Sequence, residues 1–391
     1  MMRYLVRPFN RFVRLRRRSS RVSLWFVLAL LPLSGFAADR LPMINAHAWL
    51  LIDYETGNVL VERNADQRMA PASLTKLMTA YLVFERLKAG QLHLSDKVVI
   101  SPYAAHVRGS RLRLRPGTEI AVEDLIKSML VKSANDATTA LAEHAAGSEA
   151  RFVEEMNQRA RAWGLDNTTF VNSTGLDVPG HLSTARDLSR IASALIRDFP
   201  DYYRWFSLRQ FSFKDLLLHN SNHLLWRDSA VDGMKTGYTA QAGWCLIASA
   251  QQHETRLIAT VLGAPNDRWR VEGAKRLLDY GFLHFETHLV YAANRPATEA
   301  RIFFGDAAVV PLGVAQNLYV TVPRGMYSRL RARLSIQDML YAPVRYGQRL
   351  GMLTLQLDDR VYAEYPLVAL KEISSGGVMQ RIIDDLQLSL R

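Results

Sequence analysis

The pattern of hydrophobic residues in this 391-residue chain changes near Glu286. Before that point, segments with the 3.6-residue period of a helix alternate with short apolar runs typical of strands. After it, runs of strand character recur at small spacing, and no helical period returns until residue 376. A chain of this length has room for about two domains. The pattern therefore predicts a mixed α/β domain over residues 39–285 and an all-β domain over residues 286–375.

The last segment, residues 376–391, has helical spacing again. Its apolar residues follow the i, i+3, i+4, i+7 pattern of one helix face: Met379, Ile382, Ile383, Leu386 and Leu390. Such an amphipathic helix can lie in a membrane interface, although its charged residues sum to zero and attract anionic lipid only weakly. Packing against another part of the protein is the alternative.

Residues 1–38 hold eight arginines and no acidic residue. An apolar run from Val22 to Leu33 follows the arginines, and small residues follow the run. A basic segment, a short apolar segment and small residues are the three parts of a secretory signal peptide, and the run is short for a membrane span. We expect export to the periplasm with cleavage after Ala37 or Ala38; an uncleaved anchor is the alternative.

The formal net charge of +12, from 49 basic and 37 acidic residues, by itself suggests nucleic-acid binding. Without residues 1–38, 41 basic residues face 37 acidic ones. Most of the excess belongs to the export signal, so we expect no nucleic-acid partner. The single cysteine excludes an internal disulfide and a four-cysteine zinc site. The histidines show no metal-binding spacing, and we expect neither a metal nor a cofactor.

Three short motifs carry the candidate chemistry. The first is Ser73-Leu-Thr-Lys76, in a helix expected over residues 71–84, where residues three apart lie on one face. The lysine amine can take the proton of the serine hydroxyl if burial and neighbouring positive charge lower its pKa. The second is Ser133-Ala-Asn135, in a break between two expected helices. Its hydroxyl and amide can project together into a cleft.

The third motif is Lys235-Thr236-Gly237, at the end of an expected strand and followed by Tyr238 and Thr239. A cation and hydroxyl groups can hold a carboxylate there, and the glycine lets a substrate backbone approach closely. Each motif alone is weak evidence. Their order and their separations, about 60 and then about 100 residues, are specific.

With these motifs, the chain resembles the low-molecular-mass penicillin-binding proteins, specifically the serine-type D-alanyl-D-alanine carboxypeptidases. The similarity runs from about Ala46 to Phe285 and includes Asn172-Ser-Thr-Gly-Leu-Asp177. It implies the penicillin-binding, serine β-lactamase-like transpeptidase fold, an α/β (α+β) architecture with an antiparallel sheet flanked by helices. It also implies removal of the terminal D-alanine from peptidoglycan stem peptides, and acylation by β-lactam antibiotics.

The resemblance implies a role for each matching residue. Ser73 would be the nucleophile, Lys76 would take its proton, and Ser133 would pass a proton to the leaving amine. The substrate-binding residues would be Asn135, Lys235, Thr236, Gly237, Tyr238, Thr239 and Arg270. Backbone N–H groups of Ser73 and Tyr238 would form the oxyanion hole. Tyr238 departs from the family pattern, since close relatives often carry histidine there.

Three other functions are compatible with the same fold. A β-lactamase is disfavoured by the all-β domain and by Ser-Ala-Asn in place of the Ser-Asp-Asn common in class A enzymes. A non-catalytic protein that binds the cell wall or maintains cell shape is disfavoured by the intact set of motifs. A D,D-endopeptidase that cuts cross-links with the same residues is poorly separated by the sequence.

One basic cluster remains outside the motifs. It consists of Arg108, Arg111, Arg113 and Arg115. Alternation with two leucines predicts a strand with one arginine face. Solvated surface is one interpretation of this cluster, and attraction of acidic peptidoglycan stems or anionic headgroups is the other.

Overall fold

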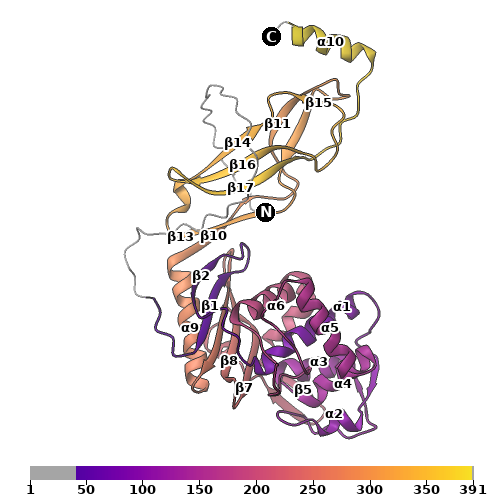
Figure 1. Ribbon diagram of the computed structural model, residues 1–391, viewed down its shortest axis with the longest axis vertical. Helices are drawn as coiled ribbons and strands as arrows, with labels where there is room; N and C mark the ends of the chain where they lie inside the picture. The colour runs from indigo at the N-terminus through magenta and orange to yellow at the C-terminus, as the bar shows by residue number, and fades with distance from the viewer. Residues whose placement is uncertain (1–40, 390–391) are drawn as a thin grey trace. The chain divides into compact units, whose positions relative to one another are not determined.

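A five-stranded antiparallel sheet forms the centre of the N-terminal domain. The computed structural model describes residues 41–389, so the expected export signal over residues 1–38 lies outside the described residues. The strands lie in the order β2 (Val59–Arg63), β1 (Ala48–Asp53), β9 (Thr255–Ala264), β8 (Gly243–Gln252) and β7 (Val231–Thr239) (Figure 1). β1 and β2 form a hairpin, and β1 also pairs with β9, so the earliest and the latest strands of this domain join in one sheet.

Helices and two short hairpins make up the rest of this domain. The helices are α1 (Lys76–Lys88), α2 (Pro102–His106), α3 (Val122–Val131), α4 (Asn135–Ala146), α5 (Glu149–Ala162), α6 (Ala185–Asp198), α7 (Pro200–Tyr203), α8 (Leu224–Arg227) and α9 (Asp267–His284), with 3-10 turns η1 (Ala72–Thr75) and η2 (Arg204–Ser207). The hairpins pair β3 (Lys97–Val99) with β4 (Glu119–Ala121), and β5 (Gln210–Phe213) with β6 (Leu216–His219).

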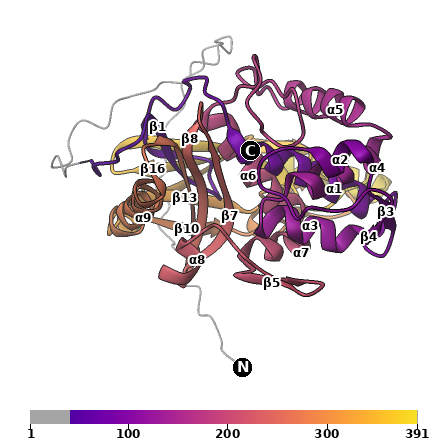
Figure 2. The same cartoon turned by 90° about the horizontal axis from the view of Figure 1, so that it is seen from below.

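Both faces of the central sheet are buried, which explains why β1 is a continuous apolar run. Successive side chains of a strand point to opposite faces. Accordingly, Leu50 and Ile52 pack with α1 and α6 in one core, whereas Trp49 and Leu51 pack with α9 in another. Figure 2 shows α9 on the opposite side of the sheet from α1, α3 and α6.

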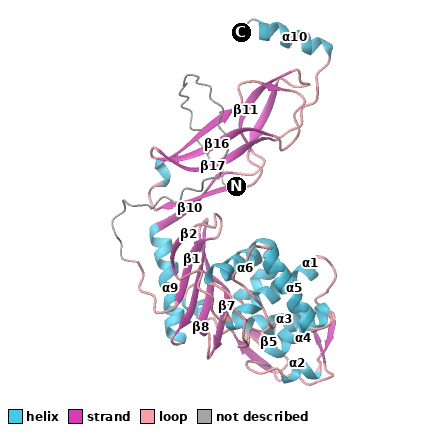
Figure 3. Ribbon diagram, viewed as in Figure 1, coloured by secondary structure: helices cyan, strands magenta, loops and turns pink. Residues whose placement is uncertain are grey.

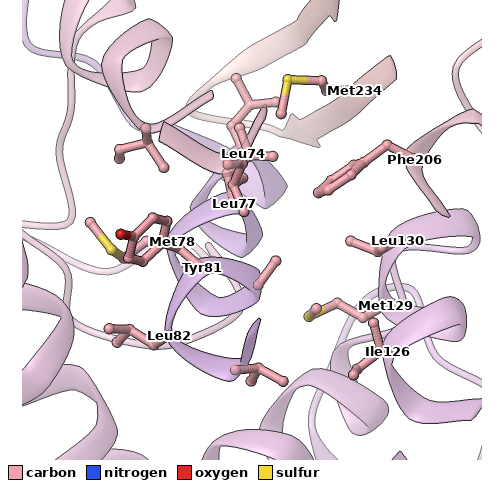
Figure 4. Packing of buried hydrophobic residues seen from close by; sticks show 14 of the residues in the cluster. Leu74, Leu77, Met78, Tyr81, Leu82, Ile126, Met129, Leu130, Phe206 and Met234 are labelled. Carbon is pink, nitrogen blue, oxygen red and sulfur yellow. The ribbon is translucent and has the colours of Figure 1, made fainter. Parts of the chain in front are cut away.

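Helix α1 is buried on nearly all sides. Figure 4 shows its apolar side chains gathered with those of α3, among them Leu77 and Met129. This packing fixes the position of its first turn. The helix expected over residues 71–84 therefore exists, but its beginning is the 3-10 turn η1, which contains Ser73.

Two further local features differ from the sequence expectations. The pattern does not predict α5, because its buried residues Phe152, Met156 and Ala160 form only a narrow stripe. The strand expected from alternating arginines and leucines is wrong, since residues 107–115 form an irregular loop. Its backbone N–H groups bond to a buried carboxylate, described below, and not to a neighbouring strand.

The C-terminal domain is all β, as expected, apart from a short 3-10 turn, η3 (Tyr327–Arg329) (Figure 3). One sheet has the order β14 (Leu330–Ile336), β16 (Arg349–Leu357), β17 (Arg360–Ala369), β12 (Val309–Gly313), β11 (Pro296–Phe303) and β15 (Leu340–Tyr341), and β10 (Phe285–Tyr291) pairs separately with β13 (Leu318–Pro323). The larger sheet has its own core, which includes Leu312 and Leu367.

The terminal helix α10 (Val378–Ser389) attaches to the all-β domain through its polar side. Asp384 is buried, and its Oδ2 accepts a hydrogen bond from the backbone N–H of Phe304 at 2.6 Å. The apolar side is exposed: Val378, Met379, Ile382, Ile383 and Leu386. Within residues 41–389, no helix has the length and apolar character needed to cross a membrane.

Candidate active site

The first motif places a hydroxyl beside a buried amine. Ser73 lies in η1 and Lys76 is the first residue of α1, so one helical turn separates them. The Nζ atom of Lys76 lies 2.9 Å from Ser73 Oγ. Lys76 is fully buried, whereas Ser73 is half-buried. The nucleophile candidate is therefore accessible while its amine partner is shielded from water.

The other two hydrogen bonds of Lys76 go to carbonyl oxygens. Its Nζ donates to Asn135 Oδ1 at 2.7 Å and to the backbone oxygen of Thr174 at 2.6 Å. A neutral amine has two N–H donors and one lone pair. The two carbonyl oxygens can only accept, so the lone pair of a neutral Lys76 can face only the hydroxyl of Ser73.

Burial makes the neutral form of this amine accessible. Desolvation, followed by the positive charge of Lys235, holds the pKa of Lys76 well below its usual value. The carboxylate of Glu149 acts in the opposite direction and raises that pKa. A lowered pKa is the condition under which a lysine can act as a base near neutral pH.

The second motif presents a strained residue with a free hydroxyl. Ser133 has a φ of 61°, a left-handed conformation that costs a non-glycine residue about 1–3 kcal/mol. Its Oγ is buried and has no hydrogen-bond partner among residues 41–389. Both features are unfavourable for stability, and such features concentrate at functional sites.

Asn135 connects the second motif to a neighbouring loop. Its Nδ2 donates to the backbone oxygen of Arg108 at 2.6 Å, while its Oδ1 accepts from Lys76. Gly109 lies against this amide, and a Cβ atom there would be 2.7 Å from Nδ2. The amide orientation is therefore set by a lysine on one side and a carbonyl on the other.

The third motif lies on β7 and presents a second buried cation. Lys235 Nζ donates to the backbone oxygen of Thr236 at 3.0 Å. Burial and the nearby charge of Arg270 lower the pKa of Lys235 to about 7. Thr236 Oγ1 makes no hydrogen bond within the described part of the chain. The remaining Lys235 donors and this hydroxyl can therefore bind an anion.

Gly237 brings β7 close to the nucleophile. A Cβ atom at this position would lie 3.1 Å from the backbone nitrogen of Ser73 and 3.0 Å from the Cβ of Ala72. The absence of a side chain thus allows the strand to pass beside η1. This approach brings the backbone on either side of Gly237 next to the N–H of Ser73.

Tyr238, Trp244 and Arg270 form a stack beside this strand. The rings of Tyr238 and Trp244 lie 4.5 Å apart, and the Arg270 guanidinium lies 4.7 Å from the Trp244 ring. Arg270 is buried and donates to the backbone oxygen of Gly237 at 3.1 Å, and its Nη2 pairs with Asp267 at 2.6 Å. Its donors are directed at the protein. Tyr238 itself is exposed.

Thr239 is engaged at the end of the strand. Its Oγ1 donates to Asp177 Oδ1 at 2.6 Å and accepts from the backbone N–H of Ala242 at 3.0 Å. The hydroxyl therefore joins β7 to the loop around Asp177.

The sequence did not indicate the residues that position the Thr174 carbonyl against Lys76. Ser173 is fully buried, and its N–H and hydroxyl both donate to Glu149 Oε1, at 2.9 and 2.5 Å. This orients the next residue, Thr174, whose carbonyl faces Lys76. Gly175 has a φ of 86°, and a Cβ there would lie 1.8 Å from the oxygen of Ala72. Gly175 belongs to the stretch Asn172–Asp177 that resembles the family, and it is the sequence signal that could have indicated this support.

His181 is a second support that the sequence did not indicate. Its Nδ1 accepts from the backbone N–H of Val171 at 3.1 Å, so the proton resides on Nε2 and is donated to Thr75 Oγ1 at 2.8 Å. Thr75 in turn donates to the oxygen of Ala72. Burial lowers the pKa of His181 to about 4, which keeps it neutral. Within residues 41–389, no group of three or more potential metal ligands is present.

Comparisons with known proteins agree with this geometry. Residues 36–266 match the D-alanyl-D-alanine carboxypeptidase family, and residues 285–375 match the family of the penicillin-binding protein 5 C-terminal domain. The D-alanyl-D-alanine carboxypeptidase DacC of Escherichia coli strain K12 is 41% identical over 362 residues, 90% of each chain.

Solved structures of penicillin-binding proteins are also similar to this chain. Penicillin-binding protein 5 from Haemophilus influenzae superposes with a TM-score of 0.81 at 39% identity, over 86% of this chain and 99% of that one. Penicillin-binding protein D2 from Listeria monocytogenes in its ampicillin-bound form has a TM-score of 0.55 at 34% identity, over 62% of this chain and all of that one. Motifs, fold and site agree, and the chain belongs to the D-alanyl-D-alanine carboxypeptidase family.

Proposed function

We propose that this protein removes the terminal D-alanine from peptidoglycan stem peptides through an acyl-enzyme on Ser73. The observation that carries the proposal is the set of partners around Lys76: two carbonyl oxygens that only accept, and one hydroxyl that can donate. This arrangement aims the lone pair of a neutral lysine at Ser73. It supplies an activated serine without a histidine or a metal.

In the first step, Ser73 Oγ attacks the carbonyl carbon of the penultimate D-alanine while its proton moves to Lys76. Negative charge develops on the carbonyl oxygen. The N–H groups of Ser73 and Tyr238 are the proposed donors to that oxygen, and the close approach of Gly237 to Ser73 supports this assignment. The tetrahedral intermediate then collapses, and the C–N bond breaks.

The leaving amine needs a proton as that bond breaks. Ser133 is the proposed relay, because its buried hydroxyl has no partner within the described residues and can both donate and accept. The proton moves from Lys76 through Ser133 to the nitrogen of the departing D-alanine. Water then attacks the acyl-enzyme ester, which releases the shortened peptide and regenerates the Ser73 hydroxyl.

The terminal carboxylate of the substrate pairs with Lys235 and Thr236 in this proposal. Asn135 binds the substrate amide and holds Lys76. Because the donors of Arg270 are directed at Gly237 and Asp267, we assign Arg270 a positioning role through strand β7, together with a contribution of positive charge.

Three residues shape the outer part of this substrate site. Gly237 gives the peptide room, and Tyr238 offers an exposed ring beside it. Thr239 fixes the end of the strand through Asp177. The same constellation would be acylated by β-lactam antibiotics, whose reactive amide and carboxylate reproduce those of the substrate.

The location and domain division are part of the proposal. Residues 1–38 serve as the export signal, the mature protein works in the periplasm, and α10 rests on the inner-membrane surface through its exposed apolar side. Residues 39–285 form the catalytic domain, 286–375 the β-rich domain and 376–391 the terminal helix. The end of α9 at His284 and the family match beginning at residue 285 support the first boundary.

One experiment tests the activity. The purified mature protein is incubated with a stem pentapeptide and, separately, with a cross-linked dimer, and released D-alanine is measured. Release from the pentapeptide that disappears in Ser73→Ala supports the carboxypeptidase. Cleavage of the dimer alone would instead identify an endopeptidase, and hydrolysis of neither would contradict the proposal.

A further inference from the structure

Four arginines of the loop over residues 108–115, here called the basic loop, have no assigned role. They are Arg108, Arg111, Arg113 and Arg115, and all four are exposed. None of them forms an ion pair with any residue between 41 and 389. Like charges concentrated on a short segment repel one another, and such a segment attracts anionic ligands.

The backbone of the basic loop is bonded directly to the second motif. Asn135 Nδ2 donates to the oxygen of Arg108, and the Asn135 N–H donates to the oxygen of Ser110, both at 2.6 Å. Ser110 Oγ donates to the oxygen of Lys132 at 2.9 Å. Since Asn135 Oδ1 also contacts Lys76 Nζ, a single side chain joins the basic loop to the reacting amine.

The middle of the loop wraps around a second buried group. Asp136 is fully buried, and its Oδ2 accepts from the N–H groups of Leu112 at 2.9 Å and Leu114 at 3.1 Å. Between them, Arg113 has a φ of 62°. This unfavourable conformation persists because both flanking amides are bonded to the same carboxylate.

The hydrogen bonds to Asp136 fix the leucines and the arginines of the loop on opposite sides of its backbone. Leu114 is buried and Leu112 packs against the core, while the arginines remain in solvent. The arginines are therefore presented on a fixed backbone, which reduces the entropy lost when they bind a ligand.

We propose that the basic loop is a docking surface for an acidic peptide: the carboxylates of the substrate that lie on the N-terminal side of the scissile D-alanyl-D-alanine bond. This inference rests on the proposed function and adds to it a preference among substrates. In the proposed function, Lys235 and Thr236 on β7 hold the terminal carboxylate. The basic loop is bonded to Asn135, the residue assigned to the substrate amide, and would meet the part of the peptide upstream of the scissile bond.

A peptide fits this surface better than a lipid bilayer does. Segments that lie on membranes combine basic residues with exposed apolar ones. In the basic loop both leucines are turned inward, and the exposed apolar residues of α10 belong to a different domain. The attachment to Asn135 also places the backbone of Arg108 and Ser110 next to a residue that the proposed function assigns to the substrate.

The test compares two peptides that end in D-alanyl-D-alanine and differ only in one upstream group, a carboxylate or its carboxamide. The ratio of the two kcat/KM values is measured for the full mature protein. We expect the acidic peptide to be preferred roughly fivefold at low salt, and the preference to shrink as salt is added. In Arg111→Gln/Arg113→Gln the ratio falls to about one.

Two further variants keep the test decisive. Arg111→Gln/Arg115→Gln leaves the strained Arg113 in place and is expected to lower the ratio as well. The control is Arg331→Gln/Arg333→Gln, which removes two exposed arginines of the same spacing from β14 and should keep the wild-type ratio. Because a ratio is measured, a partly unfolded preparation does not mimic the effect.

The opposite results overturn the inference. A wild-type ratio of about one refutes it, and so does a ratio that survives in both loop variants. If the loop variants instead lose binding to phosphatidylglycerol vesicles while the ratio persists, the surface serves a membrane. If neither peptide releases D-alanine, the proposed function has failed and the docking role falls with it, whereas cleavage of both at equal rates removes only the docking role.

Discussion

Lys76 Nζ and Asn135 Oδ1 lie 2.7 Å apart, although 59 positions separate the residues in the chain. This contact joins the first motif to the second and fixes one of the two N–H donors of a neutral lysine. The other donor goes to Thr174, which leaves the lone pair for Ser73.

Lys76→Gln should reduce the rate of acylation by about 10³-fold, because the variant has no base to accept the Ser73 proton. The rate is measured by covalent labelling with a fluorescent penicillin, and intact-protein mass gives the extent. Lys88→Gln, near the exposed end of the same helix, is the control and should label at the wild-type rate. Labelling of Lys76→Gln within about tenfold of wild type would show that another group is the base.

Glu149→Gln should move the acidic limb of the acylation profile to lower pH. The carboxylate raises the pKa of Lys76, so its loss lowers that pKa and leaves more neutral amine at acidic pH. Glutamine can still accept from Ser173 through its one oxygen, while the bond that Tyr103 donates to Oε2 is lost. Acylation rates across the pH range give the profile.

The control for this experiment is Glu154→Gln, which removes an exposed carboxylate from the same helix, α5. Its profile should match the wild-type one. A shift of the Glu149→Gln profile to higher pH, or no shift, would contradict the electrostatic role of Glu149.

The kcat/KM for peptides with a free terminal carboxylate should fall above about pH 7. Lys235 has its pKa lowered to about 7 by burial and by Arg270, so the free enzyme loses this positive charge as pH rises through that value. Lys235→Arg keeps the charge and should remove this decline, even where its overall activity is lower. An unchanged alkaline limb in Lys235→Arg would assign the decline to another group.

The protein should lose stability between pH 6.5 and pH 4 through His181. Burial lowers its pKa to about 4, so the unfolded state takes up a proton first as pH falls through this window. The contribution is complete above pH 6.5 and amounts to up to about 3 kcal/mol. Urea unfolding at both pH values measures it.

His181→Gln should be less stable than wild type at pH 7 and should lose up to about 3 kcal/mol less on acidification. Other groups also titrate, so the comparison is between variants. His253→Gln removes an exposed histidine and should follow the wild type. Equal pH dependence of all three proteins would exclude His181 as a source of acid sensitivity.

Ile382→Glu/Leu386→Glu should weaken binding to lipid vesicles by at least about tenfold, because it places two charges on the exposed apolar side of α10. Co-sedimentation of the mature protein measures the binding. The matched control, Leu216→Glu/Leu217→Glu, changes two exposed leucines of β6. If the α10 variant still binds like wild type, the helix serves another purpose.

Much of the fold could be predicted because its signals are local. The apolar run of β1, the helix after Pro71 and the strands of the C-terminal domain each follow from spacing within a few residues. Helix α5 was missed because its buried stripe is narrow. The expected strand at residues 111–115 was wrong because a distant carboxylate, Asp136, takes the backbone N–H groups that a strand partner would have taken.

In the candidate site, too, features with a local sequence signal could be predicted and features set by distant contacts could not. The order and spacing of the motifs indicated which residues form it, and the family comparisons support the chemistry. The carbonyl of Thr174 and the carboxylate of Glu149 could not be predicted, since a backbone oxygen has no sequence signature and its direction depends on packing. The same holds for Arg270, whose charge is visible in the sequence while the direction of its donors is not.

By itself, the sequence predicted a mixed α/β region followed by an all-β region, an export signal, and the residues proposed to react. Periodicity and short motifs are properties of neighbouring residues, so they are visible directly in the sequence. Only the tertiary structure decided the burial and orientation of those groups. Burial sets the pKa of Lys76 and Lys235, and contacts between residues far apart in the chain set the direction of each lone pair.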